Sequence, residues 1–288
     1  MAELKRILVA LDMRNGMQNL IEAAAFMAHA FRSEIILYHA IPKTKGSPIK
    51  EPVLKESVEQ ILEQTRGALI EQVPEVRIVT DFGSPVEQIL EAAEGYGVDL
   101  IAIGSGSKEP QDRFQLGITA EQIIRYSPRP VWVVKSRQKT EVERILCPVD
   151  FSDPSRRALD FALVLAGVLD AELTVLTVIE KLSNIYPNFP VVKPHEQGTY
   201  AEDRAAEFED FLKDVDFGDV RWKRVMLQGE PHEEILRFIH EKECRLIVMG
   251  SEGRTGVGRL ILGSVAEKVV REVPCSVITV KAGAAGAG

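Results

Sequence analysis

The chain has 288 residues, of which 45% are hydrophobic and 27% charged, and its formal net charge is −8. This length and composition indicate a globular protein of about two domains, large enough to bury a core without disulfides or a structural metal. The acidic balance argues against nucleic acid and anionic membranes as partners, because a negative field repels both.

The three cysteines and the amino terminus both favour a cytoplasmic protein. Cys147, Cys244 and Cys275 are odd in number and far apart, which excludes a disulfide framework or a zinc site and favours reduced thiols. The first apolar run ends at Asp12 and is too short for a signal peptide. No stretch approaches the roughly 18 apolar residues of a membrane span.

Taken in chain order, the blocks of the first half return in the second half in the same sequence. The early blocks Ile7–Asp12 and Glu34–Ile41 return as Ile145–Asp150 and Glu172–Ile179. The later blocks Gly83–Leu90, Asp99–Ser105 and Gly117–Lys135 return as Gly229–Leu236, Arg245–Ser251 and Gly263–Lys281. The later offset is larger by about eight residues, which we assign to a loop at Ser183–Thr199, rich in proline, asparagine and glycine. The blocks predict two copies of one domain, 1–138 and 143–281, followed by a flexible tail at 282–288.

Each copy alternates apolar runs with amphipathic stretches. In the second copy the predicted strands are Arg144–Pro148, Glu172–Ile179, Val220–Leu227, Leu246–Gly250 and Ser276–Lys281, and the predicted helices are Pro154–Leu169, Glu202–Leu212, Pro231–Lys242 and Ser264–Glu272. Ser152 and Asp153, just before Pro154, form a helix-start signal. Continuous apolar strands are typical of a parallel sheet covered on both faces. The pattern predicts an α/β protein with two tandem doubly wound domains, each a five-stranded, mainly parallel sheet with helices on both faces.

A glycine-rich segment, Gly250–Ser264, follows a strand and leads into a helix in the second copy. Glycine permits positive φ and close approach of the backbone to a ligand. Successive N–H groups and the start of the helix favour phosphate, and Arg254 and Arg259 add positive charge. Neither the P-loop pattern nor the GxGxxG dinucleotide pattern is present.

The spacing of this segment resembles a motif of the ATP-binding universal stress proteins. Gly250 and Gly253 are separated by two residues, and nine more residues precede Gly263 and Ser264, as in G-2x-G-9x-G-(S/T). Further blocks in which the second copy is similar to that family are Cys147–Ser152, Leu176–Ile179 and Gly229–Ile235.

The resemblance implies roles for residues at matching positions. Asp150 would lie beside the base and ribose, with Pro148 and Val149 before it, and Val178 would offer backbone groups to adenine. Met249 and Gly250 would line the ribose and the first phosphate. The phosphates would be held by Gly253, Arg254, Gly263, Ser264 and Val265. The ligand would be ATP, ADP or AMP, with Mg or Mn accompanying a triphosphate; we expect no dedicated metal site.

The first copy departs from this motif. Ser107 replaces the second glycine, and Ile118 replaces the hydroxyl residue. Asp12 is retained. We therefore expect weak or absent nucleotide binding in the first copy.

Three functions follow as hypotheses. The favoured one is an adenine-nucleotide-binding stress-response or regulatory module with one competent site. A slow ATPase or nucleotide-processing enzyme is an alternative, for which Asp150 and then Glu252 are the best bases and Arg254 a source of charge. A non-binding interaction module is the third. The resemblance further implies pairing of the two copies through Pro130–Lys135 and Ser276–Lys281, with a homodimer as a further assembly.

Overall fold

The computed structural model describes residues 4–13, 17–43, 50–106, 116–135, 141–180, 194–252 and 262–281. The chain divides into two compact units, and the division falls between Glu141 and Val142. The predicted tail, 282–288, lies outside the described residues. Within the described ranges, no helix is both long and apolar enough to cross a lipid bilayer.

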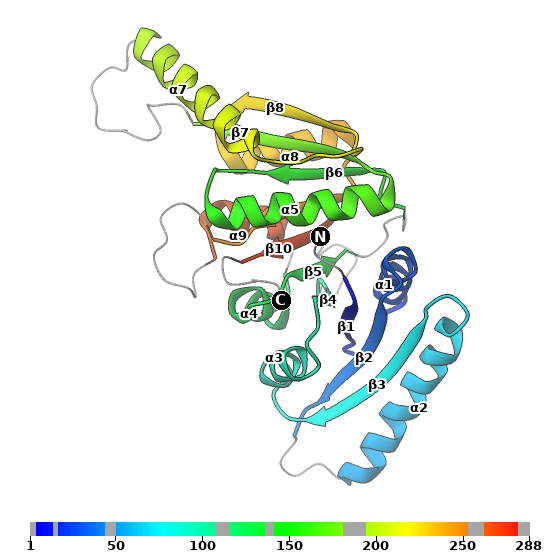
Figure 1. The fold of residues 1–288 in the computed structure, drawn as a ribbon. Coiled ribbons are helices and arrows are strands. Elements are labelled where there is room, and N and C mark those ends of the chain that lie inside the picture. Colours follow the sequence, from blue (N-terminus) through cyan, green and yellow to red (C-terminus); the bar gives the residue numbers. More distant parts are fainter. Residues whose placement is uncertain are drawn as a thin grey trace. The chain divides into compact units, whose positions relative to one another are not determined.

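The first unit is a parallel sheet with helices on both faces (Figure 1). Its elements are β1 (Arg6–Ala10), α1 (Met17–Phe31), β2 (Glu34–Ile41), α2 (Glu51–Leu69), β3 (Glu75–Phe82), α3 (Pro85–Gly95), β4 (Leu100–Gly104), α4 (Ile118–Tyr126) and β5 (Val131–Val134). The strand order is β3-β2-β1-β4-β5. The order reverses at β1, so β1 and β4 flank the switch point where such sheets bind ligands.

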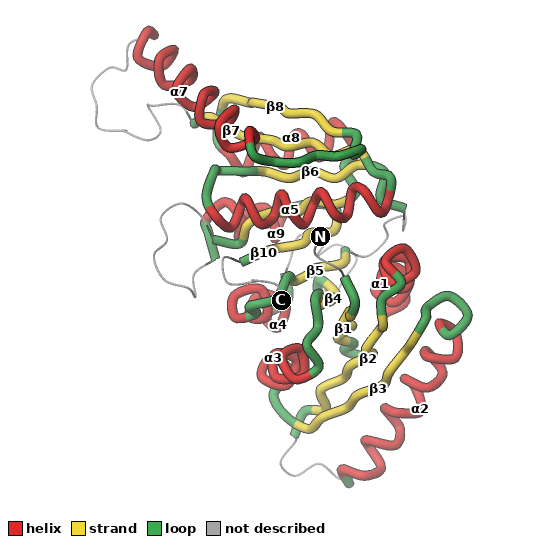
Figure 2. Tube along the Cα trace, viewed as in Figure 1, coloured by secondary structure: helices red, strands yellow, loops and turns green. Residues whose placement is uncertain are grey.

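The second unit repeats this arrangement (Figure 2). Its elements are β6 (Arg144–Pro148), α5 (Asp153–Leu169), β7 (Glu172–Ile179), α7 (Pro194–Lys213), β8 (Trp222–Gln228), α8 (Pro231–Lys242), β9 (Leu246–Gly250), α9 (Ser264–Glu272) and β10 (Ser276–Val280). The strand order is β8-β7-β6-β9-β10, and every pair is parallel. The predicted α/β class and tandem doubly wound arrangement are confirmed.

The sheet of the second unit is buried on both faces, as its continuous apolar strands predict. Ile145 and Leu146 on β6, and Ile247 on β9, are fully buried. The helices α5 and α7 lie on one face, and α8 and α9 lie on the other (Figure 1). The side chain of Ser152 accepts a hydrogen bond from the Ser155 N–H at 3.4 Å, which confirms the predicted cap of α5.

One loop prediction is wrong in part, because helix α7 begins at Pro194, inside the stretch predicted as a loop. Proline breaks helix interiors but suits the first turn, where its missing N–H has no helical partner. The single Gly198 is tolerated within α7, where an added Cβ would meet nothing within 4 Å. The strand predicted from Val220 begins two residues later, because the Val220 N–H donates to the Phe217 carbonyl in a turn.

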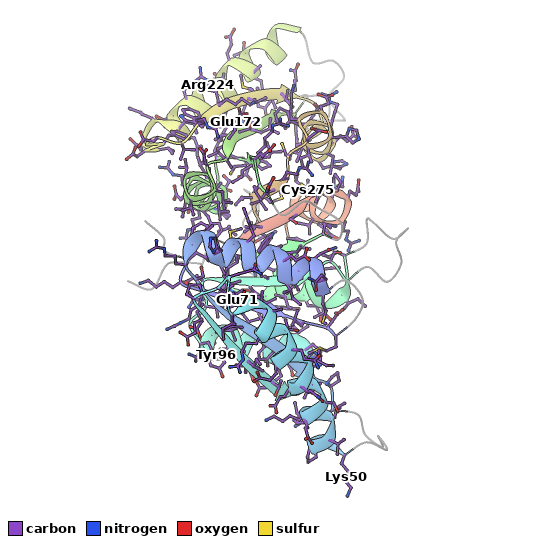
Figure 3. The ribbon with its side chains drawn as sticks, turned by 90° about the vertical axis from the view of Figure 1, so that its right-hand side faces the viewer. Lys50, Glu71, Tyr96, Glu172, Arg224 and Cys275 are labelled. Atoms are coloured by element: carbon purple, nitrogen blue, oxygen red, sulfur yellow. The ribbon has the colours of Figure 1, made fainter. Side chains whose placement is uncertain are left out.

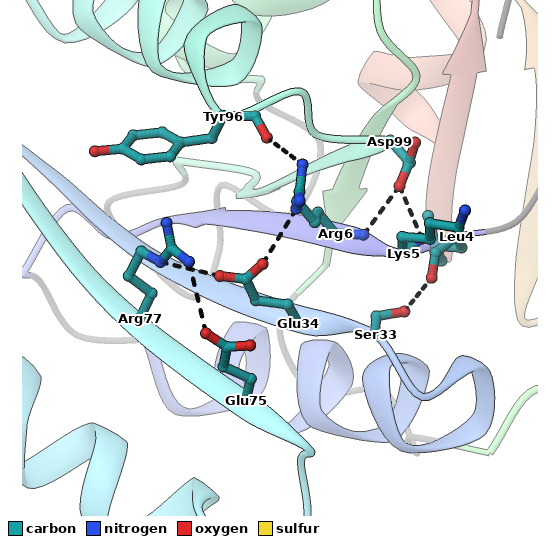
Figure 4. A network of polar contacts seen from close by, with 9 residues as sticks. All are labelled: Leu4, Lys5, Arg6, Ser33, Glu34, Glu75, Arg77, Tyr96 and Asp99. Carbon is teal, nitrogen blue, oxygen red and sulfur yellow. Dashed lines mark hydrogen bonds and ion pairs between the residues drawn. The ribbon is translucent and has the colours of Figure 1, made fainter. Parts of the chain in front are cut away.

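The amino-terminal edge of the first sheet is closed by a polar network (Figure 4). Glu34 forms ion pairs with Arg6 at 3.2 Å and with Arg77 at 3.0 Å. Arg6 also donates to the Tyr96 carbonyl at 2.9 Å, and Asp99 accepts from the Arg6 N–H at 2.9 Å. These side chains tie neighbouring strands to one another, so this edge has a structural role.

The second unit has a similar pairing at the same edge. Glu172, labelled in Figure 3, begins β7 and pairs with Lys223 of β8. The hydrogen bond from Lys223 holds the pKa of Glu172 below its usual range. Arg224, also labelled, pairs with Glu209 of α7. Both units therefore leave the opposite, carboxyl edge as the place for a ligand.

Candidate functional site

The carboxyl edge of the second sheet brings together most of the predicted site residues. Because the strands are parallel, the ends of β6, β7 and β9 meet at one edge. Three segments contribute: Pro148–Asp150 at the end of β6, Val178 near the end of β7, and Met249–Gly250 at the end of β9. Gly263, Ser264 and Val265 stand at the start of α9. Gly253, Arg254 and Arg259 lie outside the described residues.

Strand β7 runs past the end of β6, so the ladder between these two strands ends before Val178. The register between the two strands ends at Pro148 and Leu176, and the Val149 N–H donates to the Leu176 carbonyl at 2.8 Å. In a continuing ladder the Val149 carbonyl would accept the N–H of Val178. It instead accepts the hydroxyl of Thr177 at 3.1 Å. The half-buried Val178 thus presents a backbone edge that suits the hydrogen-bonding edge of a base.

Asp150 directs its carboxylate into the turn that starts α5. Its Oδ1 accepts from the Ser152 N–H at 3.1 Å and from the Ser152 hydroxyl at 2.5 Å. Ser152 in turn caps α5. The predicted capping role of this segment is therefore confirmed, and both of these bonds use Oδ1 of Asp150.

Gly250 is required here by close packing against α5, whereas the sequence suggested positive φ or close approach of the backbone to a ligand. An added Cβ would lie 3.1 Å from the carbonyl carbon and Cβ of Pro154 and 3.1 Å from the Ser155 N. Gly250 has no positive φ, and Gly263 adopts φ −61° and ψ 143°. The glycine at the end of β9 therefore lets the first turn of α5, and Asp150 with it, approach β9 closely.

The glycine-rich segment is closed at its base by a peptide hydrogen bond. The Gly263 N–H donates to the Ser251 carbonyl at 2.8 Å, and Ser251 itself donates its N–H to the Val280 carbonyl at 2.9 Å. Helix α9 begins directly after this bond, and its N-cap residue, Gly263, has no side chain with which to cap the first N–H groups. Ser264 is exposed at that start. The N–H groups of a helix start and the helix dipole favour an anion at this position.

The first unit has the same closure with different side chains. The Gly117 N–H donates to the Ser105 carbonyl at 2.8 Å. Ile118, at the position of Ser264, is 79% exposed. Gly106 has φ 72°, and a Cβ added there would lie 3.1 Å from Gly117. Glu252, at the matching position of the second unit, has no positive φ. Ser107, which replaces the second glycine of the motif in the first copy, lies outside the described residues.

Sequence reasoning missed several residues around this turn. Phe151 has a left-handed backbone, with φ 70°, and Met13 in the first unit has φ 57°. Arg204 is buried on α7 although it is charged. The sequence signal that could have identified Arg204 is that it is a charged residue on the apolar face of the predicted helix Glu202–Leu212.

Neither Cys147 nor a metal-binding cluster contributes to the described part of the site. Cys147 on β6 is fully buried, and burial raises the pKa of its thiol far above the usual range. Among the described residues, no group of three or more histidine, cysteine or carboxylate side chains is arranged to hold a metal ion. The described part of the site therefore consists of backbone groups, the carboxylate of Asp150 and the hydroxyls of Ser152, Thr177 and Ser264.

Comparison with known proteins agrees with this architecture. The model of the universal stress protein family matches residues 3–135 and again 141–281. A universal stress protein of Methanocaldococcus jannaschii is 34% identical over 146 residues, which is 48% of this chain and 82% of that protein. Universal stress protein E of Escherichia coli K12 is 24% identical over 243 residues, or 81% of this chain and 76% of that protein. The crystal structure of a universal stress protein from Archaeoglobus fulgidus covers 98% of this chain and 100% of its own, with a TM-score of 0.75 and 23% identity. The chain therefore belongs to the universal stress protein family and contains two tandem copies of its domain.

Proposed function

We propose that the second unit binds an adenine nucleotide, ATP, ADP or AMP, and acts as a regulatory module. The observation that carries the proposal is the arrangement of three features along one sheet edge. Val178 offers a backbone edge for adenine, Asp150 a carboxylate for the ribose, and the start of α9, with glycine as its N-cap, a place for phosphate. Their order follows the order of base, sugar and phosphate in a nucleotide.

The geometry supports binding more strongly than hydrolysis. Oδ1 of Asp150 already accepts two hydrogen bonds from Ser152, which commits this oxygen to the turn. A general base needs a free lone pair within reach of the attacking water. A divalent ion would arrive with the triphosphate, because the described residues contain no group of three or more side chains arranged to hold a metal ion.

Isothermal titration of the purified chain with ATP, ADP and AMP tests the proposal. We expect one equivalent of nucleotide per chain. Ser264→Ile, which installs the residue of the first unit, should weaken binding by roughly 10-fold to 100-fold, because a hydrogen bond to a charged group is worth about 1.5–3 kcal/mol. Combining it with Gly253→Ser should make the second unit resemble the first.

Ile118→Ser in the first unit is the matched control, and it should leave the affinity of the second unit unchanged. Mass spectrometry of nucleotide retained through purification identifies the natural occupant. The proposal is wrong if none of the three nucleotides binds with millimolar or better affinity, which corresponds to about −4 kcal/mol.

A further inference from the structure

We propose that Phe151, held by aromatic and cationic contacts from α7, positions Asp150 and thereby sets how well the second unit recognises the ribose of its ligand. The inference rests on the proposed nucleotide function and deepens it. Phe151 and the α7 residues that hold it are positioning residues, because they act through Asp150.

The backbone at Phe151 is strained. Its φ of 70° lies in the left-handed region, which L-residues with large side chains avoid. Such a conformation persists where the surroundings over-determine it, and it is concentrated at functional sites. Phe151 stands between Asp150 and the capping residue Ser152, so its conformation sets the direction in which the carboxylate points.

Three side chains of α7 surround the Phe151 ring. Phe208 stacks on it with ring centroids 5.7 Å apart and an interplanar angle of 24°. Phe211 lies at 5.4 Å with a tilt of 43°. The guanidinium of Arg204 lies 4.4 Å from the ring centroid, and Arg204 is paired with Glu207. Aromatic pairs and a desolvated cation over a ring are each stabilising, so together they oppose the strain.

A second contact fixes α7 to the same turn from the other side. Arg156, in the first turn of α5, donates to the Phe211 carbonyl at 3.0 Å and to the Asp214 carbonyl at 3.0 Å. Its guanidinium also lies 5.7 Å from the ring of Phe211. Both ends of the turn from Asp150 to Arg156 therefore contact the carboxyl-terminal part of α7 and the residue just after it.

The first unit keeps the strained turn without these contacts. Met13 follows Asp12 and has φ 57°. On α2 the buried residues Val58 and Leu62 have the spacing of Arg204 and Phe208. The aromatic and cationic contacts thus occur in the unit that retains the nucleotide motif, whereas the unit with the altered motif has aliphatic side chains in their place.

The arrangement also gives α7 a route to the ligand. Figure 1 shows the amino-terminal part of α7 extending past the carboxyl edge of β7 and β8, on the side where Asp150 lies. The carboxyl-terminal part of α7 contacts Phe151. Ribose recognition and the placement of α7 are therefore linked through Phe151, next to Asp150, and through Arg156 in the first turn of α5.

The test compares ATP with 2′-deoxy-ATP and 3′-deoxy-ATP by titration calorimetry. The wild-type chain should bind ATP roughly 10-fold more tightly than the poorer analogue, as expected for a lost hydrogen bond to a carboxylate. Phe208→Leu keeps an apolar side chain of the type that α2 has and removes the ring. It should bring this ratio to about one by weakening ATP, as Asp150→Asn should.

Arg204→Met should also lower the ratio, and Arg204→Lys should restore most of it, because it keeps a cation near the ring. Phe217→Leu is the matched control. It removes a ring stacked on Trp222 at 3.7 Å at the amino-terminal end of β8, and the ratio should not change. An unchanged ratio in Phe208→Leu, equal weakening of ATP and its analogues, or no ribose preference in the wild type overturns the inference. Absence of ATP binding by the wild type instead overturns the proposed function on which it rests.

Discussion

A methyl group added at the end of β9 in the second unit should lower stability, whereas the same change at the end of β4 in the first unit should raise it. Gly250 and Gly104 occupy the same place in the repeat. A Cβ at Gly250 would meet three atoms of Pro154 and Ser155 at 3.1 Å, and two of these are backbone atoms. A Cβ at Gly104 would meet nothing within 4 Å.

The magnitudes follow from these contacts. Overpacking against atoms that cannot rotate away costs about 1–3 kcal/mol. Replacing glycine by alanine without strain stabilises by about 0.4–1 kcal/mol, because the unfolded chain loses freedom. Gly250→Ala should therefore destabilise its unit by about 1–2 kcal/mol, and Gly104→Ala should stabilise its unit slightly. With a urea m-value of about 2 kcal/mol/M, the midpoint for Gly250→Ala should fall by roughly 0.5–1 M.

The two tryptophans make the assay specific to each unit. Trp132 lies on β5 and Trp222 on β8, so each unit contains one. Fluorescence-monitored urea unfolding in a Trp132→Phe background reports on Gly250→Ala, and a Trp222→Phe background reports on Gly104→Ala. Equal midpoint shifts for the two substitutions would refute the view that close approach of α5 is what requires glycine at position 250.

Three further predictions concern the thiols, the acid limit and the helix cap. All three cysteines are buried, and burial raises the pKa of Cys244 to about 11. Ellman's reagent at pH 8 should therefore modify the thiols in urea and leave them unmodified in the native chain. Rapid labelling of the native chain would contradict this. Because the pKa of Glu172 is lowered in the folded chain, the stability that its carboxylate contributes is present at neutral pH and is lost as pH falls below about 4.3 and through the folded-state pKa. The free energy of unfolding of Glu172→Gln should therefore depend less on pH in acid. If it depends on pH as in the wild type, the pair with Lys223 contributes nothing to stability. Ser152→Ala should lower the free energy of unfolding by about 1 kcal/mol, whereas Ser84→Ala, at a helix start whose serine makes no capping bond, should change it little in thermal melts.

Most strands could be predicted because their pattern and their environment agree. The predicted bounds of Arg144–Pro148 and Leu246–Gly250 match β6 and β9, since apolar runs of that length are stable in a sheet covered on both faces. Val220 is apolar as well, but it lies before β8 and not in the strand that was predicted to begin there. Its side chain lies near Gly167 of α5, where a Cβ would be 3.6 Å from the Val220 Cγ2, so it packs on a helix from within a turn.

The turn after β6 could not be predicted in the same way. The sequence around Asp150 shows a carboxylate and a cap signal, and both are observed. The left-handed conformation of Phe151 depends on side chains of α7, more than fifty positions away in the chain. The role of Gly250 likewise depends on how closely α5 approaches. Such tertiary contacts decide backbone geometry, and single-sequence patterns do not report them.

A backbone hydrogen bond closes the glycine-rich segment of the second unit and the matching segment of the first unit, so the ligand site can change while the fold is kept. The Ser105–Gly117 and Ser251–Gly263 hydrogen bonds join a backbone carbonyl to a backbone N–H, so neither bond uses a side chain; at Gly106, however, an added Cβ would lie 3.1 Å from Gly117. After duplication of an ancestral domain, one copy could accumulate substitutions within this segment while its sheet and helices remained under unchanged selection. The segment is accordingly a natural exchange point for chimeras, in which residues between the two closing bonds are transplanted from one unit to the other.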